Sequence, residues 1–267
     1  MSSENYLIKS NASLKNQKPL QDKVAIVTGS SYGIGFAIAR RLAQDGAHVL
    51  LCSRKTENVD KAVQQLKEEG LSISGIQCHV GNEKDREKLV AMALVTYGKI
   101  DILICNAAVN PFVGPLFETT EEVWKKVFDV NVISTFLLIK LVVPHIQKQG
   151  RGSIIICSSF TGYIPEPHFG PYAITKTTLF GLTNILAQAL RFMNIRVNGL
   201  ALGVINTNFS KVILKTPELK SKLIPLGVHR LGEPEECAGI ASFLCSEDAS
   251  YINGENIGVT GGMLGRL

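Results

Sequence analysis

The chain has 267 residues, of which 45% are hydrophobic, and a formal net charge of +5. This is enough for one substantial core, and α/β folds often reach this length as a single domain. The basic residues are scattered rather than gathered in a block, which argues against nucleic-acid binding and a polybasic membrane segment. No uninterrupted apolar run reaches the roughly 18 residues of a membrane-spanning helix. We therefore expect neither nucleic acid nor a membrane span.

Both ends of the chain bear on localisation. Residues 1–20 lack a secretory apolar core and are interpreted as a flexible leader, followed by one domain over 21–267. Their lysines leave a mitochondrial transit peptide open. The last three residues, Gly265-Arg266-Leu267, resemble the peroxisomal S-K-L address. The prediction is peroxisome or cytoplasm, with the mitochondrion as the alternative.

The chain carries six cysteines and no C-x-x-C pair. Four of them fall in apolar runs that resemble buried strands, so buried reduced thiols in a reducing compartment are expected rather than disulfides or metal ligands. The sequence shows no H-E-x-x-H motif and no cluster of Cys and His, so no metal site is predicted. The cysteines are Cys52, Cys78, Cys105, Cys157, Cys237 and Cys245.

Short β-rich runs alternate with helix-length segments along the chain. Several runs are almost continuously apolar, which indicates strands covered on both faces and hence a parallel sheet. The alternation predicts a single doubly wound α/β domain of Rossmann type, with seven parallel strands and helices on both faces. Strands are expected at 23–29, 47–53, 72–78, 101–107, 152–159, 194–201 and 256–262, and helices include 33–45, 83–97, 119–148 and 172–192.

The segment "TGSSYGIG" joins the first strand to the first helix. Glycines with the spacing G-x-x-x-G-x-G let the backbone turn sharply and approach a pyrophosphate, and the helix N-terminus offers free N–H groups. The alternative is a turn with a purely structural role. The residues predicted to contact a dinucleotide here are Gly29, Ser31, Gly33, Ile34 and Gly35.

The end of the second strand, "LLCSRK", predicts which dinucleotide is bound. An acid at this point binds the ribose hydroxyls of NAD, whereas an arginine suits the 2′-phosphate of NADP. Here Ser53 occupies the position of the acid and Arg54 follows. We therefore predict NADP(H), with both side chains near the 2′-phosphate. NAD preference and a solvated surface role for Arg54 remain open.

Tyr172 and Lys176 lie four residues apart on a predicted helix and so share one face. A free tyrosine has a pKa near 10. The lysine, together with the positive nicotinamide of an oxidised cofactor, is expected to lower that pKa and make Tyr172 a proton donor and acceptor.

Taken together, residues 22–262 resemble the short-chain dehydrogenase/reductase family. The matching motifs are "TGSSYGIG", "CNAAV" around Asn106, "NV" at Asn131, Ser159 thirteen residues before Tyr172, and Tyr172-x-x-x-Lys176. "RVNGLALG" also resembles the family pattern. Three positions depart from it: Ala108 stands for Gly, Thr175 for Ser and Leu202 for Pro.

The resemblance implies a catalytic tetrad of Asn131, Ser159, Tyr172 and Lys176. Ser159 would donate a hydrogen bond to a carbonyl oxygen, Tyr172 would protonate that oxygen, and Lys176 would also hold the nicotinamide ribose. Asn131 would hold a water molecule that links Lys176 to solvent. The further cofactor contacts implied are Val80, Asn106, Val204, Ile205 and Thr207.

Other segments, such as "NAAVNPF", are similar to a subgroup of peroxisomal NADPH-dependent carbonyl and retinal reductases, which implies a homotetramer. The substrate loops would be 108–118, 160–171 and 203–229. Their aromatic residues suggest apolar or aromatic ketones, dicarbonyls, quinones, retinal or oxosteroids. Phe112, Phe160 and Phe169 are the predicted substrate contacts, with Phe117, Tyr163 and Phe209 also in these loops.

Two functions therefore remain. The first is an NADPH-dependent carbonyl reductase that runs in reverse as an alcohol dehydrogenase. The second is a dinucleotide-binding regulatory or interaction protein with little turnover, which Ala108 and Leu202 motivate because one fold can serve unrelated functions.

Overall fold

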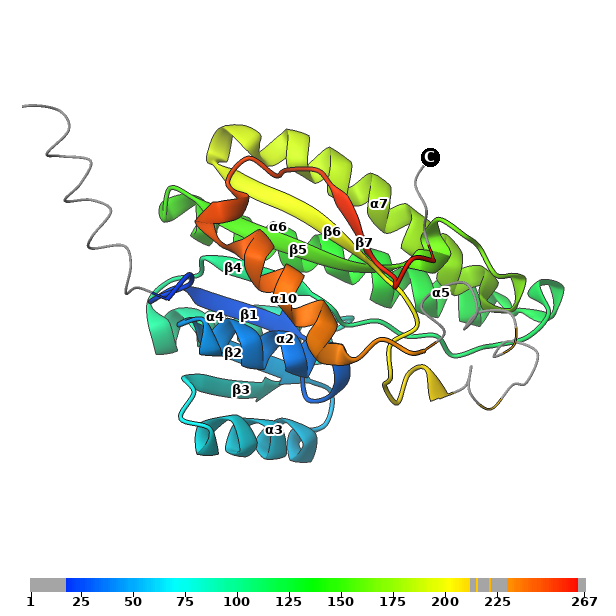
Figure 1. Cartoon of the computed structure of the whole chain (residues 1–267), viewed down its shortest axis with the longest axis horizontal. Helices are drawn as coiled ribbons and strands as arrows, with labels where there is room; N and C mark the ends of the chain where they lie inside the picture. Colours follow the sequence, from blue (N-terminus) through cyan, green and yellow to red (C-terminus); the bar gives the residue numbers. More distant parts are fainter. Residues whose placement is uncertain (1–17, 212–214, 216–220, 222–229, 264–267) are drawn as a thin grey trace, which may run out of the picture.

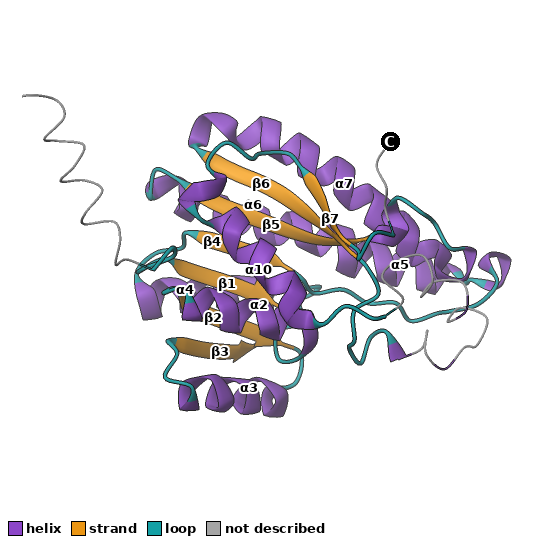
Figure 2. Ribbon diagram, in the orientation of Figure 1, coloured by secondary structure: helices purple, strands orange, loops and turns teal. Residues whose placement is uncertain are grey.

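The computed structural model of the chain describes residues 18–211, 215, 221 and 230–263. The expectations for residues 1–17, for most of the loop 212–229 and for the C-terminal tripeptide lie outside this part. Seven parallel strands form one sheet in the order β3-β2-β1-β4-β5-β6-β7 (Figures 1 and 2). The strands are β1 Val24–Thr28, β2 His48–Ser53, β3 Ile73–Gln77, β4 Ile102–Cys105, β5 Gly152–Ser159, β6 Ile195–Leu202 and β7 Asn256–Val259. The predicted doubly wound fold is confirmed.

The strands alternate their side chains between two apolar layers, which is why nearly continuous hydrophobic runs are needed. Ala25 and Val27 pack with α2 (Gly33–Gln44), α3 (Thr56–Glu68) and α10 (Pro234–Cys245) on one face. Ile26 packs with α4 (Glu83–Tyr97), α6 (Ser134–Lys148) and α7 (Gly170–Leu190) on the other. Figure 2 shows the sheet between these helices.

The predicted helix 119–148 is not uniform. It begins as α5 (Glu121–Phe128), passes through one π-helical turn at Asp129–Ile133 and continues as α6. Such turns are frequent at functional sites, and this one carries Asn131. By length and composition alone the stretch Glu121–Lys148 could cross a membrane, although 44% of its most apolar window is buried inside the protein.

Core contacts begin one residue before the predicted domain boundary at residue 21. Leu20 is fully buried in the core beside α2, and its backbone N–H donates a 2.9 Å hydrogen bond to the carbonyl of Asp45. Because Leu20 buries its apolar side chain in the core, it belongs to the folded domain. The ordered chain therefore includes residues before 21.

Candidate active site

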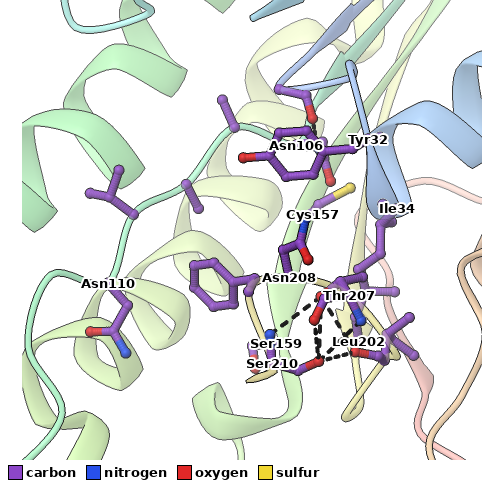
Figure 3. A pocket seen from close by; sticks show the side chains of 18 of the residues that line it. Tyr32, Ile34, Asn106, Asn110, Cys157, Ser159, Leu202, Thr207, Asn208 and Ser210 are labelled. Atoms are coloured by element: carbon purple, nitrogen blue, oxygen red, sulfur yellow. Dashed lines mark hydrogen bonds between the residues drawn. The ribbon is translucent and has the colours of Figure 1, made fainter. Parts of the chain in front are cut away.

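A cavity of about 780 Å³ opens at the carboxyl ends of the strands (Figure 3). This is the edge at which doubly wound sheets bind their ligands. Seventeen of the predicted site residues line it: Gly29, Ser31, Gly33, Ile34, Gly35, Ser53, Arg54, Val80, Asn106, Ser159, Phe160, Phe169, Tyr172, Lys176, Val204, Ile205 and Thr207.

The loop after β1 is held in a tight turn against the end of β4. Gly29 has a φ of +60°, and a Cβ atom there would lie 2.9 Å from the Cα of Ala107. A Cβ on Gly35 would lie 2.5 Å from the carbonyl oxygen of Gly29. Only glycine fits these two positions without displacing backbone, so the loop stays thin enough for a ligand to approach its N–H groups.

Asn106 and Thr28 join the loop to β4 through partly buried hydrogen bonds. Asn106 Nδ2 donates to the carbonyls of Thr28 at 3.0 Å and Gly29 at 2.9 Å. Thr28 Oγ1 accepts from the backbone N–H groups of Asn106 at 3.0 Å and Ala107 at 3.1 Å. Asn106 therefore supports the loop through its side chain as well as lining the cavity. No motif or spacing in the sequence indicated a role for Thr28.

The loop fits a phosphate-bearing ligand. The Oγ atom of Ser31 is buried without a hydrogen-bond partner in the described structure. The N-cap residue of α2, Tyr32, makes no side-chain capping bond, so the first N–H groups of that helix are not satisfied by the cap. A free hydroxyl and a helix N-terminus together suit an anion. Thr207 packs closely against this loop, since a Cβ atom added to Gly33 would lie 3.2 Å from Thr207 Cγ2.

The mouth of the cavity after β2 is basic. Arg54, Lys55 and Lys61 line it together with Ser53 and Asn58. Among the described lining residues there is no aspartate or glutamate. Three cations and a hydroxyl suit an additional phosphate better than the free hydroxyls of a ribose.

Tyr172 and Lys176 project into this cavity from the first turns of α7. Lys176 is 3% exposed, and its Nζ donates a 2.9 Å hydrogen bond to the carbonyl of Cys157. The same Nζ lies 5.3 Å from the centre of the Tyr172 ring. Ser158 Oγ donates a 2.8 Å bond to the carbonyl of Lys176, which ties α7 to β5. The prediction that the pair shares one helix face is confirmed.

In the chain by itself, burial dominates the pKa values of both residues. Burial lowers the pKa of Lys176 from its usual value near 10.5 to about 8. Burial also raises the pKa of Tyr172, and a hydrogen bond with Ser159 opposes part of this rise. Lys176 is not among the groups that shift the pKa of Tyr172 in the chain alone, where burial disfavours the charged phenolate. The lowering expected from Lys176 together with an oxidised nicotinamide stays a prediction.

Ser159 ends β5 and faces the cavity with a fixed hydrogen-bond pattern. Its Oγ accepts a 3.2 Å bond from the backbone N–H of Thr161 and a 2.9 Å bond from Thr161 Oγ1. Thr161 also lines the cavity. The role of Thr161 could not be predicted from the sequence, because a threonine after a strand has no distinctive spacing.

Asn131 is the member of the predicted tetrad that does not line the cavity. It is 1% exposed; its Oδ1 accepts a 2.8 Å bond from the N–H of Val109, and its Nδ2 donates to the carbonyl of Val109 at 3.0 Å. The Nδ2 also donates to Thr175 Oγ1 at 3.1 Å, and Thr175 Oγ1 donates to the carbonyl of Tyr172 at 2.7 Å. Asn131 therefore joins three segments of the site, and its water-holding role stays a prediction.

The aromatic lining is smaller than predicted. Phe160 and Phe169 line the cavity, as does Phe209, whose ring centre is 5.6 Å from that of Tyr172. Phe112 is not among the lining residues, and its ring instead lies against Gly114. Two amides that the sequence analysis did not select, Asn110 and Asn208, also line the cavity (Figure 3).

Two other aromatic residues of the predicted substrate loops also lie away from the cavity. Phe117 is 99% exposed. Tyr163 stacks on Phe180 at 4.1 Å between ring centres and donates a 3.1 Å bond to the carbonyl of Asn256. Sequence could not separate these residues, because neighbours on an irregular loop point in different directions.

The remaining expectations concern the departures from the family pattern and the cysteines. Leu202 is 5% exposed, pairs with Val259 in the sheet and packs in the core. Ala108 lines the cavity. All six cysteines are buried and free of disulfides, as predicted. In the part of the chain that the structure describes, no group of His, Cys, Asp and Glu is arranged to hold a metal ion.

The comparisons with known proteins agree with this site. The family profile described as enoyl-(acyl carrier protein) reductase matches residues 29–264. Dehydrogenase/reductase SDR family member 4 of Bos taurus is 56% identical over 255 residues, which cover 95% of this chain and 91% of the relative. Dehydrogenase/reductase SDR family member 2, mitochondrial, of Homo sapiens is 51% identical over 243 residues, which cover 91% and 86%.

A solved structure of a short-chain type dehydrogenase/reductase from Mycobacterium ulcerans superposes with a TM-score of 0.87 at 30% identity, covering 91% of this chain and 90% of that one. Sequence, fold and site geometry thus point to the same family, and the resemblance drawn from the motifs is confirmed. The chain belongs to the short-chain dehydrogenase/reductase family and is an oxidoreductase that acts on CH–OH and C=O groups.

Proposed function

We propose that this protein is an NADP(H)-dependent carbonyl reductase, reversible as an alcohol dehydrogenase, with apolar or aromatic carbonyl substrates. The observation that carries the proposal is the convergence of Ser159, Tyr172 and Lys176 on one cavity whose mouth is lined by Arg54. A hydroxyl, a phenol and an ammonium beside a phosphate-binding loop are the groups that carbonyl reduction requires.

When bound, the nicotinamide cofactor supplies the hydride. Ser159 donates a hydrogen bond to the substrate oxygen, on which negative charge builds up during the reaction. Tyr172 transfers its proton to that oxygen, and both hydroxyls stabilise the charge in a partly dehydrated cavity. The raised pKa of Tyr172 keeps the phenol protonated in the free protein, so it is ready to act as the acid in the reductive direction.

Lys176 is proposed to assist the proton transfer from Tyr172. Its pKa of about 8 leaves it mainly charged at neutral pH, but close enough to that pH for the ammonium to give up its proton during the reaction. A positive ammonium 5.3 Å from the phenol ring favours the phenolate as it forms. Lys176 is also proposed to hold the nicotinamide ribose, and Asn131 to fix the α5–α6 turn beside it.

The preference for NADP(H) rests on charge at the cavity mouth. Arg54, Lys55 and Lys61 surround the end of β2, and no carboxylate is among the described lining residues. A glutamate or aspartate there would accept hydrogen bonds from the ribose hydroxyls, whereas cations form charge-assisted hydrogen bonds that offset the loss of water from an additional phosphate. We therefore expect NADPH to be the better cofactor, and NADH to be used poorly.

The proposed substrate class is supported by the lining of the cavity that contains Tyr172. Phe160, Phe169 and Phe209 supply apolar surface, while Asn110 and Asn208 add two amides. An aromatic or extended apolar ketone, a dicarbonyl, retinal or an oxosteroid has this combination of apolar bulk and few polar atoms.

A dinucleotide-binding protein without turnover remains the second candidate. The observations behind it are Leu202, which replaces a proline of the family pattern and packs in the core, and Ala108 in the cavity wall. If these residues displace the nicotinamide from Tyr172, NADPH would bind without reducing any ketone.

We also propose a homotetramer. Exposed apolar residues lie on the α6–α7 side of the molecule: Ile133, Phe136, Ile174 and Ile185 are 42–64% exposed. Ile174 and Ile185 are eleven residues apart and so share one face of α7.

A peroxisomal or cytoplasmic location, with the mitochondrion as alternative, is proposed from the terminal segments, and masking Leu267 with a C-terminal tag tests the peroxisomal address.

The decisive experiment is a steady-state panel. NADPH and NADH are each combined with aromatic ketones, α-dicarbonyls, retinal, an oxosteroid and an α,β-unsaturated thioester, using wild type and Tyr172→Phe. Ketone reduction by wild type that is abolished in Tyr172→Phe supports the reductase. Tight NADPH binding with no turnover on any carbonyl supports the binding protein and overturns the reductase.

A further inference from the structure

A short chain of hydroxyls runs into the candidate active site from Thr161. Thr161 Oγ1 donates a 2.9 Å hydrogen bond to Ser159 Oγ, and the backbone N–H of Thr161 donates to the same oxygen at 3.2 Å. Ser159 in turn interacts with the phenol of Tyr172, which lowers the phenol's pKa against the larger effect of burial. Thr161 and Ser159 are 2% and 6% exposed, and both line the cavity.

The hydrogen count of Ser159 follows from these contacts. A serine hydroxyl has one hydrogen to donate and two lone pairs that accept. Both lone pairs of Ser159 are occupied by Thr161. The only remaining capacity is the O–H bond, and the neighbour that can receive it from inside the cavity is Tyr172 or a substrate oxygen.

The side chain of Thr161 is itself held in place. A β-branched side chain has a stiff χ1 angle, and Thr161 lies in the 3₁₀ turn Phe160–Gly162, which follows β5 directly. Burial of the pair also strengthens each hydrogen bond and polarises the next one along the chain.

We propose that Thr161 is a positioning residue that directs the Ser159 hydroxyl hydrogen into the cavity, toward the oxygen that gains charge. The inference rests on the proposed reductase function. Without the threonine hydroxyl, one lone pair of Ser159 is free, and the serine can rotate and spend part of its time as an acceptor rather than a donor. Transition-state stabilisation is then lost while cofactor binding is retained.

The test uses Thr161→Val, which removes the hydroxyl but keeps the shape and the backbone N–H, and Thr161→Ser, which keeps the hydroxyl. We expect Thr161→Val to lower kcat about 3- to 10-fold, the worth of one hydrogen bond, with KM for NADPH within about twofold of wild type. Thr161→Ser should recover most of the loss. An unchanged kcat in Thr161→Val overturns the proposal.

The matched control is Thr183→Val. Thr183 is a fully buried threonine whose Oγ1 donates to the carbonyl of Leu179 at 2.9 Å in the middle of α7. It reports what the loss of one buried hydroxyl does to folding and activity through stability alone. A loss of kcat in Thr183→Val equal to that in Thr161→Val counts against a positioning role.

A double mutant separates action through Ser159 from general damage. In a Ser159→Ala background, Thr161→Val should change kcat by less than about twofold, because residues that act as a unit are not additive. The same fold loss in both backgrounds overturns the proposal.

A crystal structure separates this inference from the proposed function. Ordinary X-ray data do not show hydroxyl hydrogens, so the measurement is neutron diffraction of both proteins. Wild type should show the Ser159 hydroxyl hydrogen directed into the cavity, and Thr161→Val should show it in two or more directions. If wild type reduces no carbonyl, the proposed function fails, but the hydrogen positions still decide whether Thr161 orients Ser159. The same single hydrogen position in both proteins refutes the positioning role.

Discussion

The ammonium of Lys176 lies 5.3 Å from the centre of the Tyr172 ring and donates its 2.9 Å hydrogen bond to the carbonyl of Cys157 rather than to the phenol. At this distance the lysine can favour a negative phenolate only through its charge, and not through a direct hydrogen bond. Burial of both groups raises the pKa of Tyr172 and lowers that of Lys176, so the free protein holds a protonated phenol beside an easily deprotonated amine.

Replacing Tyr172 with phenylalanine should abolish the acid without disturbing the pocket. Loss of a positioned general acid costs about 10²- to 10⁴-fold in rate, and we expect this loss in kcat, with the Kd for NADPH changed by less than about threefold. Steady-state kinetics and fluorescence titration of NADPH measure the two quantities. Retention of more than a tenth of wild-type kcat would remove Tyr172 from the mechanism.

Lys176 gives the stability of the protein a pH dependence with a definite sign. Its folded pKa is about 8 and its usual value is near 10.5, so between these values the unfolded chain binds the proton that the folded chain lacks. The contribution of Lys176 to the free energy of unfolding therefore increases as pH rises from 8 to 10.5. Below pH 8 the lysine is charged in the folded protein, so burying that charge lowers the stability by its full amount.

The variant Lys176→Met removes this term. In the protein without added nucleotide, its Tm should exceed that of wild type most at pH 7, and the difference should shrink as pH approaches 10. Differential scanning fluorimetry of both proteins across pH 7–10 measures this. A difference in Tm that stays constant with pH contradicts the lowered pKa.

Arg54 should decide between the two nicotinamide cofactors. A hydrogen bond to a charged group contributes roughly 10- to 100-fold in binding, so Arg54→Ala should raise KM for NADPH by about that factor while KM for NADH changes little. The control is Arg151→Ala, a half-exposed arginine paired with Glu247 and outside the cavity lining. Equal losses with both cofactors would mean that Arg54 does not contact the 2′-phosphate.

Thr28 should contribute to stability beyond its size. Thr28→Val keeps the shape but leaves the N–H groups of Asn106 and Ala107 without their acceptor. Each buried group left unsatisfied costs about 1–3 kcal/mol, so two such groups would cost about 2–6 kcal/mol. Because both N–H groups are only partly buried, we expect a loss in the lower part of this range, about 2–4 kcal/mol, in the free energy of unfolding measured by urea denaturation. Thr178→Val, which removes an exposed hydroxyl on α7, should stay within about 0.5 kcal/mol of wild type.

The apolar α6–α7 surface should control assembly. Charged replacements of Phe136 and Ile185, which are 43% and 64% exposed, should split the proposed tetramer into smaller species, since an unpaired buried charge opposes association. Size-exclusion chromatography with light scattering gives the mass. The control is Val95→Glu, because Val95 is an exposed residue of α4. A wild type that is monomeric, or variants that keep the wild-type mass, would rule out this surface.

Much of the site could be predicted because its motifs are local. The spacing of Tyr172 and Lys176 on a helix, and the glycines after β1, depend only on backbone geometry over a few residues. Thr28, Thr161 and Thr175 could not be predicted, because a threonine acquires its role from the partner that the fold brings within about 3 Å of its hydroxyl. Phe112, predicted as a substrate contact, is absent from the cavity lining; its direction could not be read from the sequence, because loop residues have no periodicity.

The sequence by itself determined the class of sheet, the order of strands and helices, the phosphate loop and the residue types of the catalytic group, because hydrophobic pattern and glycine positions express backbone preferences directly. Only the tertiary structure decided the protonation energetics and the connections among polar groups. Burial depends on which segments pack over a side chain, so it took the folded chain to reveal that Tyr172 is made less acidic, that Asn131 is held by Val109 and Thr175, and that Ser159 has its lone pairs filled by Thr161.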